Sequence, residues 1–456
     1  MMKALAKHLR KVALAATALL GLLWPLAAGA QPAEGLTLRQ SIEMALTRSV
    51  LLNAAREGVR ENEARRKEAF TGFLPKLSTA YSYTRLNEDP SFYFSGIPPL
   101  VPARQMTTGT KDNYLWTLEA RQPLFAGGAI VSNYEANRLA VDIDRHDETA
   151  VAQELVLEVK VAYFNVLKAR RVLSVAVQSL EQLAAHRNNA QDFFSAGLIP
   201  RNDLLQAQVR WANGRQFLLR AQNALAMAEA AFNTLLRREL GAAVVIEDIL
   251  HDRPFRETLE ACIAAALEKR PELQSAALRV TQAQNLVKVS AGDYYPSLNL
   301  VGNYARFGDT AALSGTPYRD QENWSAMVVA NWTFWEWGKT KNRVAAGRSR
   351  ENQAGDLLTH ARDRVTLEVK NAYLLLQEAQ KQLQVSRETI GQAEENFRIT
   401  GERYGAQVGT ATEVIDAQTL LTGTRADYAN ALSDYAIQRA RLEKAMGKAD
   451  PGEDRE

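Results

Sequence analysis

The segment that comes nearest to a catalytic motif is Trp337-Gly338-Lys339-Thr340. It follows an alternating apolar segment and opens a helical pattern, which is the context of a phosphate-binding loop. The first glycine of that motif would have to stand at position 333, where the chain has Thr333. The motif is therefore incomplete, and we reject nucleotide binding at this segment.

Other catalytic and metal-binding patterns are missing from the sequence. Beyond the N-terminal segment there are four histidines, and none is paired at the helical spacing of a metal site. Neither H-E-x-x-H nor G-x-S-x-G occurs. The single cysteine, Cys262, lies among alanines and is typical of a small buried apolar residue. We therefore expect no enzyme activity, no cofactor and no metal site. The histidines are His146, His186, His251 and His360.

One pair of carboxylates has a spacing that could matter. Glu413 and Asp416 are three residues apart, so they share a helix face just after a turn. The alternative is the ordinary acidic first turn of a helix, which the helix dipole favours. In the first half of the chain, Asp203 is the counterpart of Glu413, whereas Gln206 replaces Asp416.

The N-terminus has the pattern of a secretory signal. A basic region ends at Lys11, an apolar run covers residues 12–27, and Ala28-Gly29-Ala30 forms a small-residue cleavage site. We expect cleavage after Ala30. Elsewhere no run is apolar over the ~18 residues of a spanning helix. Removing residues 1–30 takes the formal charge from +3 to −1, so bulk charge does not favour nucleic-acid binding.

The chain is internally duplicated. At an offset of 221, Pro75, Tyr83 and Arg85 match Pro296, Tyr304 and Arg306. At an offset of 210 the matches are those of Gly128 with Gly338, of residues 157–160 with 367–370, and of residues 207–208 with 417–418. The repeat therefore predicts two copies of one structural plan.

Each copy reads as two shorter helices, two strands and a long helical hairpin. No glycine or proline interrupts residues 129–196, which predicts a helix on the order of 100 Å long. A second long helix is expected from about Lys339 to Tyr404. We assign residues 31–250 to the first repeat, with strands about 75–87 and 113–123 and a hairpin over 128–239. Residues 251–448 form the second, with strands about 296–307 and 323–335 and a hairpin over 338–447, before a short polar tail, 449–456.

The four predicted strands alternate between apolar and polar residues over about ten positions, as tilted strands crossing a bilayer do. Leu77, Thr79, Tyr81 and Tyr83 alternate with small or polar residues, and Trp324 begins a similar pattern in the second half. A sheet in lipid must close on itself, and closure takes at least about eight strands. We therefore expect several copies to share one barrel. Residues 86–112 and 308–321 would be its long outer loops.

The order of these features resembles the TolC-like outer-membrane efflux and secretion channels. The carriers are the signal peptide, the duplicated plan, Pro75 and Pro296 before the strands, the exits 123–128 and 333–338, and the tip 404–410. The resemblance covers Leu36 to about Lys448. It implies a mixed, mainly α fold whose long hairpins form a periplasmic α-barrel. Four strands per chain would contribute to a shared, trimeric, 12-stranded transmembrane β-barrel in the outer membrane.

The resemblance also implies function. The chain would be a homotrimeric, passive exit duct of a tripartite efflux or type I secretion system, joined through a periplasmic adaptor to an inner-membrane pump. Its helix tips would meet the adaptor, and an acidic ring would narrow the periplasmic mouth. The first acid of that ring is Glu413 here, whereas the best-known member of the family has aspartate. The tip residues are Ala196, Gly197, Leu198, Ile199, Pro200, Gln407, Val408, Gly409 and Thr410; the ring residues are Glu413, Asp416 and Asp203.

The rival prediction is a soluble periplasmic coiled-coil adaptor or scaffold. Its hairpins would form a docking rod and its alternating segments would form soluble β-domains. The aromatic residues at the ends of the fourth strand argue against it, because a soluble domain has less reason to carry so many there. These are Trp324, Trp332, Phe334, Trp335 and Trp337.

Overall fold

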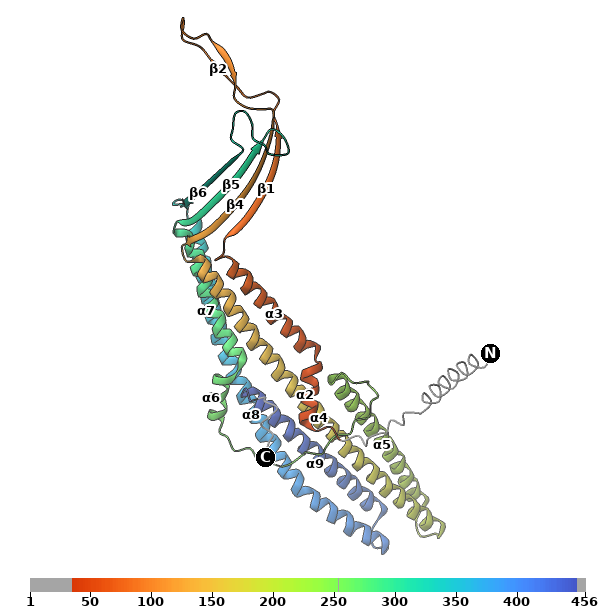
Figure 1. Cartoon of the computed structure of the whole chain (residues 1–456). Coiled ribbons are helices and arrows are strands. Elements are labelled where there is room, and N and C mark those ends of the chain that lie inside the picture. The colour runs from red at the N-terminus through yellow and green to blue at the C-terminus, as the bar shows by residue number, and fades with distance from the viewer. Residues whose placement is uncertain (1–34, 253, 449–456) are drawn as a thin grey trace, which may run out of the picture.

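A computed structural model describes residues 35–252 and 254–448 of the chain. The expected signal peptide and the polar tail lie outside the described residues. The molecule is elongated, with the tips of two helical hairpins at one end and a sheet at the other (Figure 1). Among the described residues, no helix combines the length and the apolar character needed to cross a membrane.

The two halves of the chain repeat the same order of elements. Helices α4 and α8 have 67 residues each, and helices α5 and α9 have 35 residues each. The first repeat contains α2 (Leu38–Arg48), α3 (Val50–Thr71), β1 (Lys76–Arg85), β2 (Ser91–Phe94), β3 (Arg104–Thr107), β4 (Asp112–Ala126), α4 (Ala129–Ser195) and α5 (Arg201–Leu235). The second contains α6 (Leu259–Lys269), α7 (Pro271–Ala291), η1 (Gly292–Tyr294), β5 (Ser297–Gly308), β6 (Glu322–Asn331), α8 (Lys339–Gly405) and α9 (Ala411–Ala445).

Both long helices begin after a glycine in the left-handed conformation. Gly128 precedes α4 with φ of 80°, and Gly338 precedes α8 with φ of 82°. Glycine adopts this conformation at little steric cost, which accounts for the match between these two positions in the repeat. The chain thereby turns sharply from each strand into its long helix.

The four long strands form one antiparallel sheet in the order β1-β4-β5-β6. Residues directly opposite each other on neighbouring strands share a face of the sheet. Tyr81 lies opposite Trp116, Leu118 opposite Tyr304, and Tyr304 opposite Trp324. On the other face, Ala80 lies opposite Thr117, Glu119 opposite Asn303, and Asn303 opposite Ser325. The alternation in all four strands therefore combines into one largely apolar face and one mainly polar face.

Two details of the sheet differ from the prediction. The outer loop after β1 is not wholly irregular, because β2 and β3 pair within it as a hairpin arm that projects beyond the sheet (Figure 1). Strand β6 ends at Asn331 rather than near residue 335. There the indole of Trp332 donates a hydrogen bond to the carbonyl of Tyr294 at 3.2 Å, so the following residues leave the sheet.

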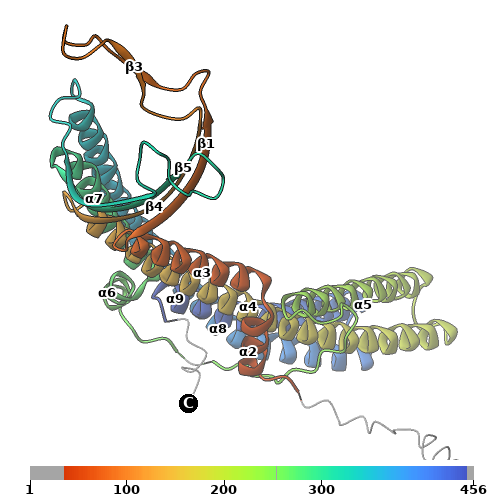
Figure 2. The same ribbon diagram turned by 45° about the horizontal axis from the view of Figure 1, so that its top comes forward.

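The main core lies where the hairpins meet the shorter helices (Figure 2). Helix α4 is central, since it contacts α2, α3, α5, α7 and α9. The hydroxyl of its fully buried Tyr163 donates to the backbone oxygen of Glu247 at 2.7 Å and lies 3.2 Å from that of Leu36. The segments that precede α2 and follow α5 are thereby held against the long helices.

Candidate functional site

The first helix tip is a five-residue turn between α4 and α5. Gly197 adopts φ of 72°, which lets the chain reverse directly after Ala196. Pro200 then stands at the N-cap of α5. Between them Leu198 is 55% exposed, so an apolar side chain projects from the end of the hairpin. The predicted tip residues of the first half thus form one exposed turn.

The second tip reaches the same geometry with different residues. Here Gln407 takes the left-handed conformation, with φ of 60°. The backbone N–H groups of Val408 and Gly409 both donate to the carbonyl of Arg403, at 3.0 and 3.1 Å. Val408 is 68% exposed, and its counterpart Leu198 is likewise exposed. The two hairpins therefore present matching apolar points at the far end of the molecule (Figure 1).

The carboxylates expected to line a periplasmic mouth lie just behind these tips. Glu413 forms a capping box with Thr410: its N–H donates to the Thr410 hydroxyl at 3.2 Å, and its carboxylate accepts from the Thr410 N–H at 3.4 Å. Arg403 lies 3.8 Å from the same carboxylate. Asp416 is exposed one turn further along α9, and Asp203 is in the first turn of α5. Glu413 thus has a local structural role whether or not it lines a pore.

A buried aromatic cluster near the tips joins the two hairpins. Tyr404 of α8 packs on two residues of α4, with ring centroids 5.4 Å from His186 and 5.7 Å from Phe193. Burial raises the pKa of Tyr404, with a smaller contribution from Asp203, and burial lowers the pKa of His186. The sequence marks Tyr404 only as part of the tip motif, because its partners are more than 200 residues away in the chain.

Two buried polar atoms in this cluster are unsatisfied. Among the described residues, neither the Tyr404 hydroxyl nor Nε2 of His186 has a hydrogen-bond partner. Such atoms each cost stability, on the order of 1–3 kcal/mol. At this cluster the hairpins are therefore held by ring packing, whereas further along they share polar bonds, such as those of Gln182 with Gln418 at 2.6 Å and of Ser179 with Thr422 at 3.0 Å.

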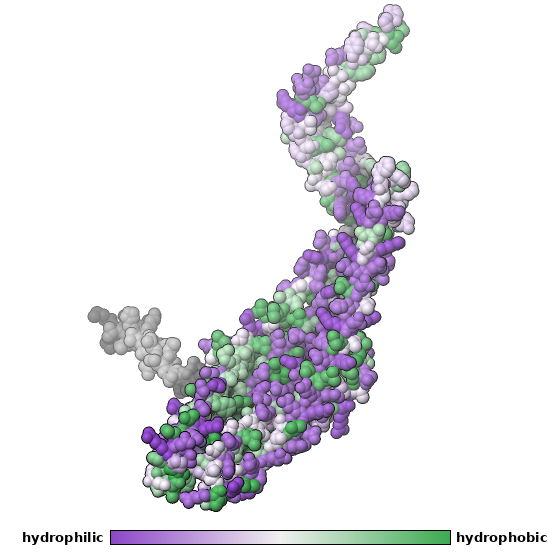
Figure 3. All heavy atoms as spheres, turned by 180° about the vertical axis from the view of Figure 1, so that it is seen from behind, coloured by the Kyte–Doolittle hydropathy of each residue, from purple (hydrophilic) through white to green (hydrophobic). Residues whose placement is uncertain are grey.

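The free sides of the helical layer carry exposed apolar residues. Helices α5 and α8 lie at its two sides, since α5 contacts α4 far more than α9 and α8 contacts α9, α7 and α6. From Leu204 to Ala228, α5 carries Arg210, Arg215 and Arg220 and no acid. Apolar and polar side chains intermingle over the shaft (Figure 3). Exposed apolar residues on these helices are Leu205, Val209, Leu219 and Met227 of α5, and Leu357, Leu367, Leu374, Val385 and Ile399 of α8.

The last turns of α8 before the second tip are acidic on balance. Between positions 388 and 402 it carries Glu388, Glu394, Glu395 and Glu402 against Arg398 alone. Over the whole of α8, twelve basic residues outnumber nine acidic ones, so the acidic character is confined to this stretch.

Comparison with known proteins agrees with this architecture. The chain is 22% identical over 420 residues to the outer membrane efflux protein BepC of Brucella suis. The aligned region covers 92% of this chain and 87% of that one. It is 23% identical to the protein CyaE of Bordetella pertussis, over 92% of this chain and 84% of that one.

Solved structures share the fold. The outer membrane protein VceC of Vibrio cholerae superposes with a TM-score of 0.77, at 16% identity, over 90% of this chain and 96% of that one. The outer membrane channel CmeC of Campylobacter jejuni gives the same TM-score, over 91% and 88%. The fold expected from the sequence, long helical hairpins with a four-stranded sheet, is therefore confirmed.

The family assignment follows the repeat itself. A sequence model described as outer membrane efflux protein matches residues 41–236 and 262–448, which correspond to the two halves of the duplicated chain. Together these segments cover most of the sequence. The chain belongs to the outer membrane efflux protein family.

Proposed function

We propose that three copies of this chain assemble into one passive duct, with a shared β-barrel in the outer membrane and a helical tunnel through the periplasm. The observation that carries the proposal is the pairing of the sheet. Its register gathers the apolar residues on one face, and within the described residues β1 and β6 each pair along one side only. In lipid, the unpaired N–H and C=O groups of such edges must be satisfied.

Closure of the sheet requires other copies. Four strands are too few, since about eight is the minimum for a membrane barrel. Three copies supply twelve strands, with β6 of one copy antiparallel to β1 of the next. The apolar face would then contact lipid and the polar face would line the lumen. The exposed apolar residues on the free sides of α5 and α8 support the same arrangement along the helical shaft.

The helix tips are the proposed docking site for a periplasmic adaptor. The exposed Leu198 and Val408 give each hairpin an apolar end that a partner of helical-hairpin form could cover. Through that adaptor the duct would receive cargo from an inner-membrane pump, which would supply the energy. The names of relatives such as BepC, an outer membrane efflux protein, support an efflux or secretion role.

The acidic residues behind the tips are proposed to act on the permeating ions. In a trimer, Glu413 and Asp416 would form stacked rings of three carboxylates, with Asp203 nearby on α5. Such rings favour cations and repel anions. No catalytic role is proposed for any part of the chain.

The test is membrane fractionation followed by an unheated detergent gel. We expect an outer-membrane species of about three times the mature mass that collapses to the monomer on boiling. A monomer in the periplasmic wash would overturn the channel and would favour the soluble coiled-coil adaptor. Sequencing the N-terminus of the purified protein would check that it begins at Gln31.

A further inference from the structure

In each repeat a strand runs into a long helix, at the end of β4 and at the end of β6. Within one chain, only the end of β4 lies beside a turn from a shorter helix into a strand. At the end of β4, Phe125 and Ala126 pair with Leu298 and Ser297 of β5, and the chain then turns into α4 beside α7. The end of β6 turns into α8 in the same way, but β6 is the last strand of the sheet. By the repeat, the segment that should pair with the end of β6 is the turn from α3 into β1, and this turn lies at the opposite edge of the sheet. The second junction can therefore form only between copies.

The intrachain junction depends on two glycines. A Cβ atom placed on Gly127 would lie 2.4 Å from the carbonyl oxygen of Gly292, and one on Gly292 would lie 2.9 Å from Cβ of Ala129. The backbone segments are thus in direct contact, with no room for side chains. Under the offsets of the repeat, Gly127 corresponds to Trp337 and Gly292 corresponds to Thr71. The junction between copies must therefore be built differently.

Trp337 has the backbone conformation of the glycine that it replaces. Its φ is 50°, against 58° for Gly127. A bulky residue with positive φ is a genuine outlier, and such strain persists only where the surroundings impose it. Yet Trp337 is 87% exposed in the single chain, and Trp335, whose ring lies 5.6 Å from it, is 66% exposed. Within the described chain, little covers the residue that carries the strain.

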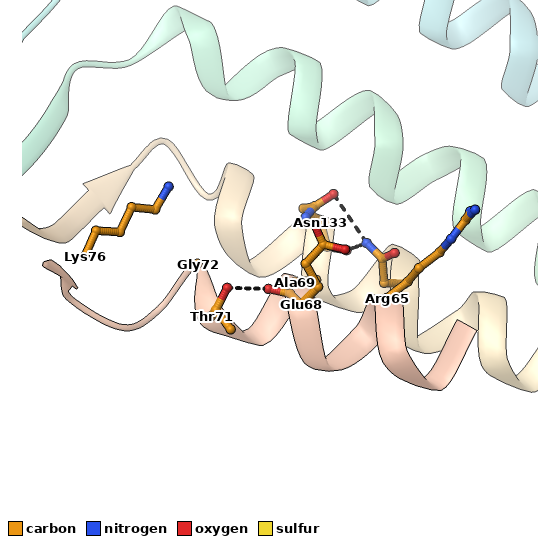
Figure 4. A pocket seen from close by; sticks show the side chains of 8 residues that line it. Arg65, Glu68, Ala69, Thr71, Gly72, Lys76 and Asn133 are labelled. Carbon is orange, nitrogen blue, oxygen red and sulfur yellow. Dashed lines mark hydrogen bonds between the residues drawn. The ribbon is translucent and has the colours of Figure 1, made fainter. Parts of the chain in front are cut away.

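A recess lies at the junction that would face this segment. It occupies about 420 Å³ between the end of α3, the start of β1 and the first turns of α4 (Figure 4). Thr71, the counterpart of Gly292, lines it, and so do Lys76, the first residue of β1, and Arg65 of α3. Cationic side chains stack favourably on an indole ring. Glu68, Asn133 and Asn137 also line the recess and could accept a hydrogen bond from an indole N–H.

We infer that Trp337 of one copy lies in the α3–β1 recess of the next copy, beside Thr71 and within reach of Lys76 and Arg65. The inference rests on the proposed trimer, because antiparallel pairing of β6 with β1 of the next copy puts the end of one strand beside the start of the other. The two kinds of junction would then be built from different residues. Glycine contacts close the junction within a chain, and an inserted tryptophan closes the junction between chains.

Paired cysteines test this placement directly. The full-length protein carries Trp337→Cys and Lys76→Cys together with Cys262→Ala, and each single-cysteine variant serves as a control. Residues 76 and 337 lie at opposite edges of the sheet in one chain, so a disulfide between them must join two copies. After oxidation, we expect the double variant to run as a covalent trimer on a boiled, non-reducing gel. The single-cysteine variants should run as monomers.

The outcomes separate this inference from the proposal on which it rests. A heat-labile trimer on the unheated gel without any covalent trimer after oxidation would overturn the docking of Trp337 and leave the channel intact. A monomer on the unheated gel would instead overturn the trimer itself.

A second variant keeps the test independent of cysteine chemistry. Trp337→Gly introduces the residue of the first repeat, relieves the strained backbone and removes the indole. We expect its trimer to dissociate at a lower temperature than that of the unsubstituted protein. Trp324→Ala, at the other end of β6, is the matched control and should lower the dissociation temperature of the trimer less. Equal losses in both variants would contradict a specific role for Trp337.

Discussion

The ring of Tyr404 lies 5.4 Å from the ring of His186, and this contact joins the second helical hairpin to the first just behind the tips. Tyr404 is 8% exposed, and Phe193 packs on its other side. Hydrogen bonds between α4 and α9, such as the one that Gln418 donates to Gln182 at 2.6 Å, also join the two hairpins. The aromatic cluster thus adds to the contacts that set the position of the tips relative to each other.

Truncation of Tyr404 should loosen the tips. We expect Tyr404→Ala to cost on the order of 3 kcal/mol locally, because it removes a buried ring. Hydrogen exchange of the amides in residues 186–210 and 397–414 should then accelerate, while exchange in the main core stays unchanged. Tyr404→Phe is the control: it keeps the ring, removes an unpartnered hydroxyl and should leave exchange as slow as before. Slow exchange in Tyr404→Ala would show that the cluster does not hold the hairpins together.

The same contact should weaken in acid. Burial lowers the pKa of His186 below its ordinary value of 6.5, so the unfolded state takes up the proton first as the pH falls. The stability contributed by neutral His186 is therefore complete above pH 6.5 and is lost as the pH falls from there through the folded pKa. Exchange at the tips, measured from pH 8 to pH 5, should rise over this range beyond the intrinsic trend. In His186→Gln the additional rise should disappear; an identical profile in both proteins would exclude His186 as its source.

Neutral substitutions test the acidic ring without disturbing the helix. Glu413→Ala would also remove the capping box with Thr410, whereas Glu413→Gln keeps a side chain able to form it. We expect Glu413→Gln with Asp416→Asn to weaken block of the single-channel current by multivalent cations at least about tenfold, a change of 1.4 kcal/mol. The trimer should assemble normally. Unchanged block in planar bilayers would remove the ring from the mechanism.

Arg270 should be one of the most sensitive positions in the second repeat. Its side chain is 2% exposed and donates to Glu272 at 3.0 Å, to Glu368 at 3.1 Å and to the carbonyl of Ala445 at 3.2 Å. Removing one partner of a buried ionic network costs about 3–5 kcal/mol, because the remaining groups lose their partners. Arg270→Ala should lower the midpoint of thermal unfolding markedly.

The matched control for Arg270 is an exposed ion pair. Arg39 and Glu43 are 2.9 Å apart with more than half of each side chain exposed, so Arg39→Ala should cost less than about 1 kcal/mol. Equal effects of the two substitutions on the unfolding midpoint would mean that the Arg270 network is not a stability determinant.

Much of the fold could be predicted because it depends on local patterns. Uninterrupted helical sequence predicts α4, and Gly128 and Gly338 mark where the long helices begin. Alternation predicts the strands, and the repeat predicts that both halves share a plan. The hairpin of β2 and β3 was missed because strands of four residues leave too short a pattern to recognise.

The duplication, the lengths of the helices and the two faces of the sheet can be predicted from the sequence, because each depends on residues close together in the chain. Which distant residues meet depends on how the elements pack. Only folding brings Tyr404 of α8 to His186 of α4, or separates Lys76 and Trp337 to opposite edges of the sheet. Spacing along the chain encodes no distance across 200 residues, so such contacts follow from strand order and helix packing alone.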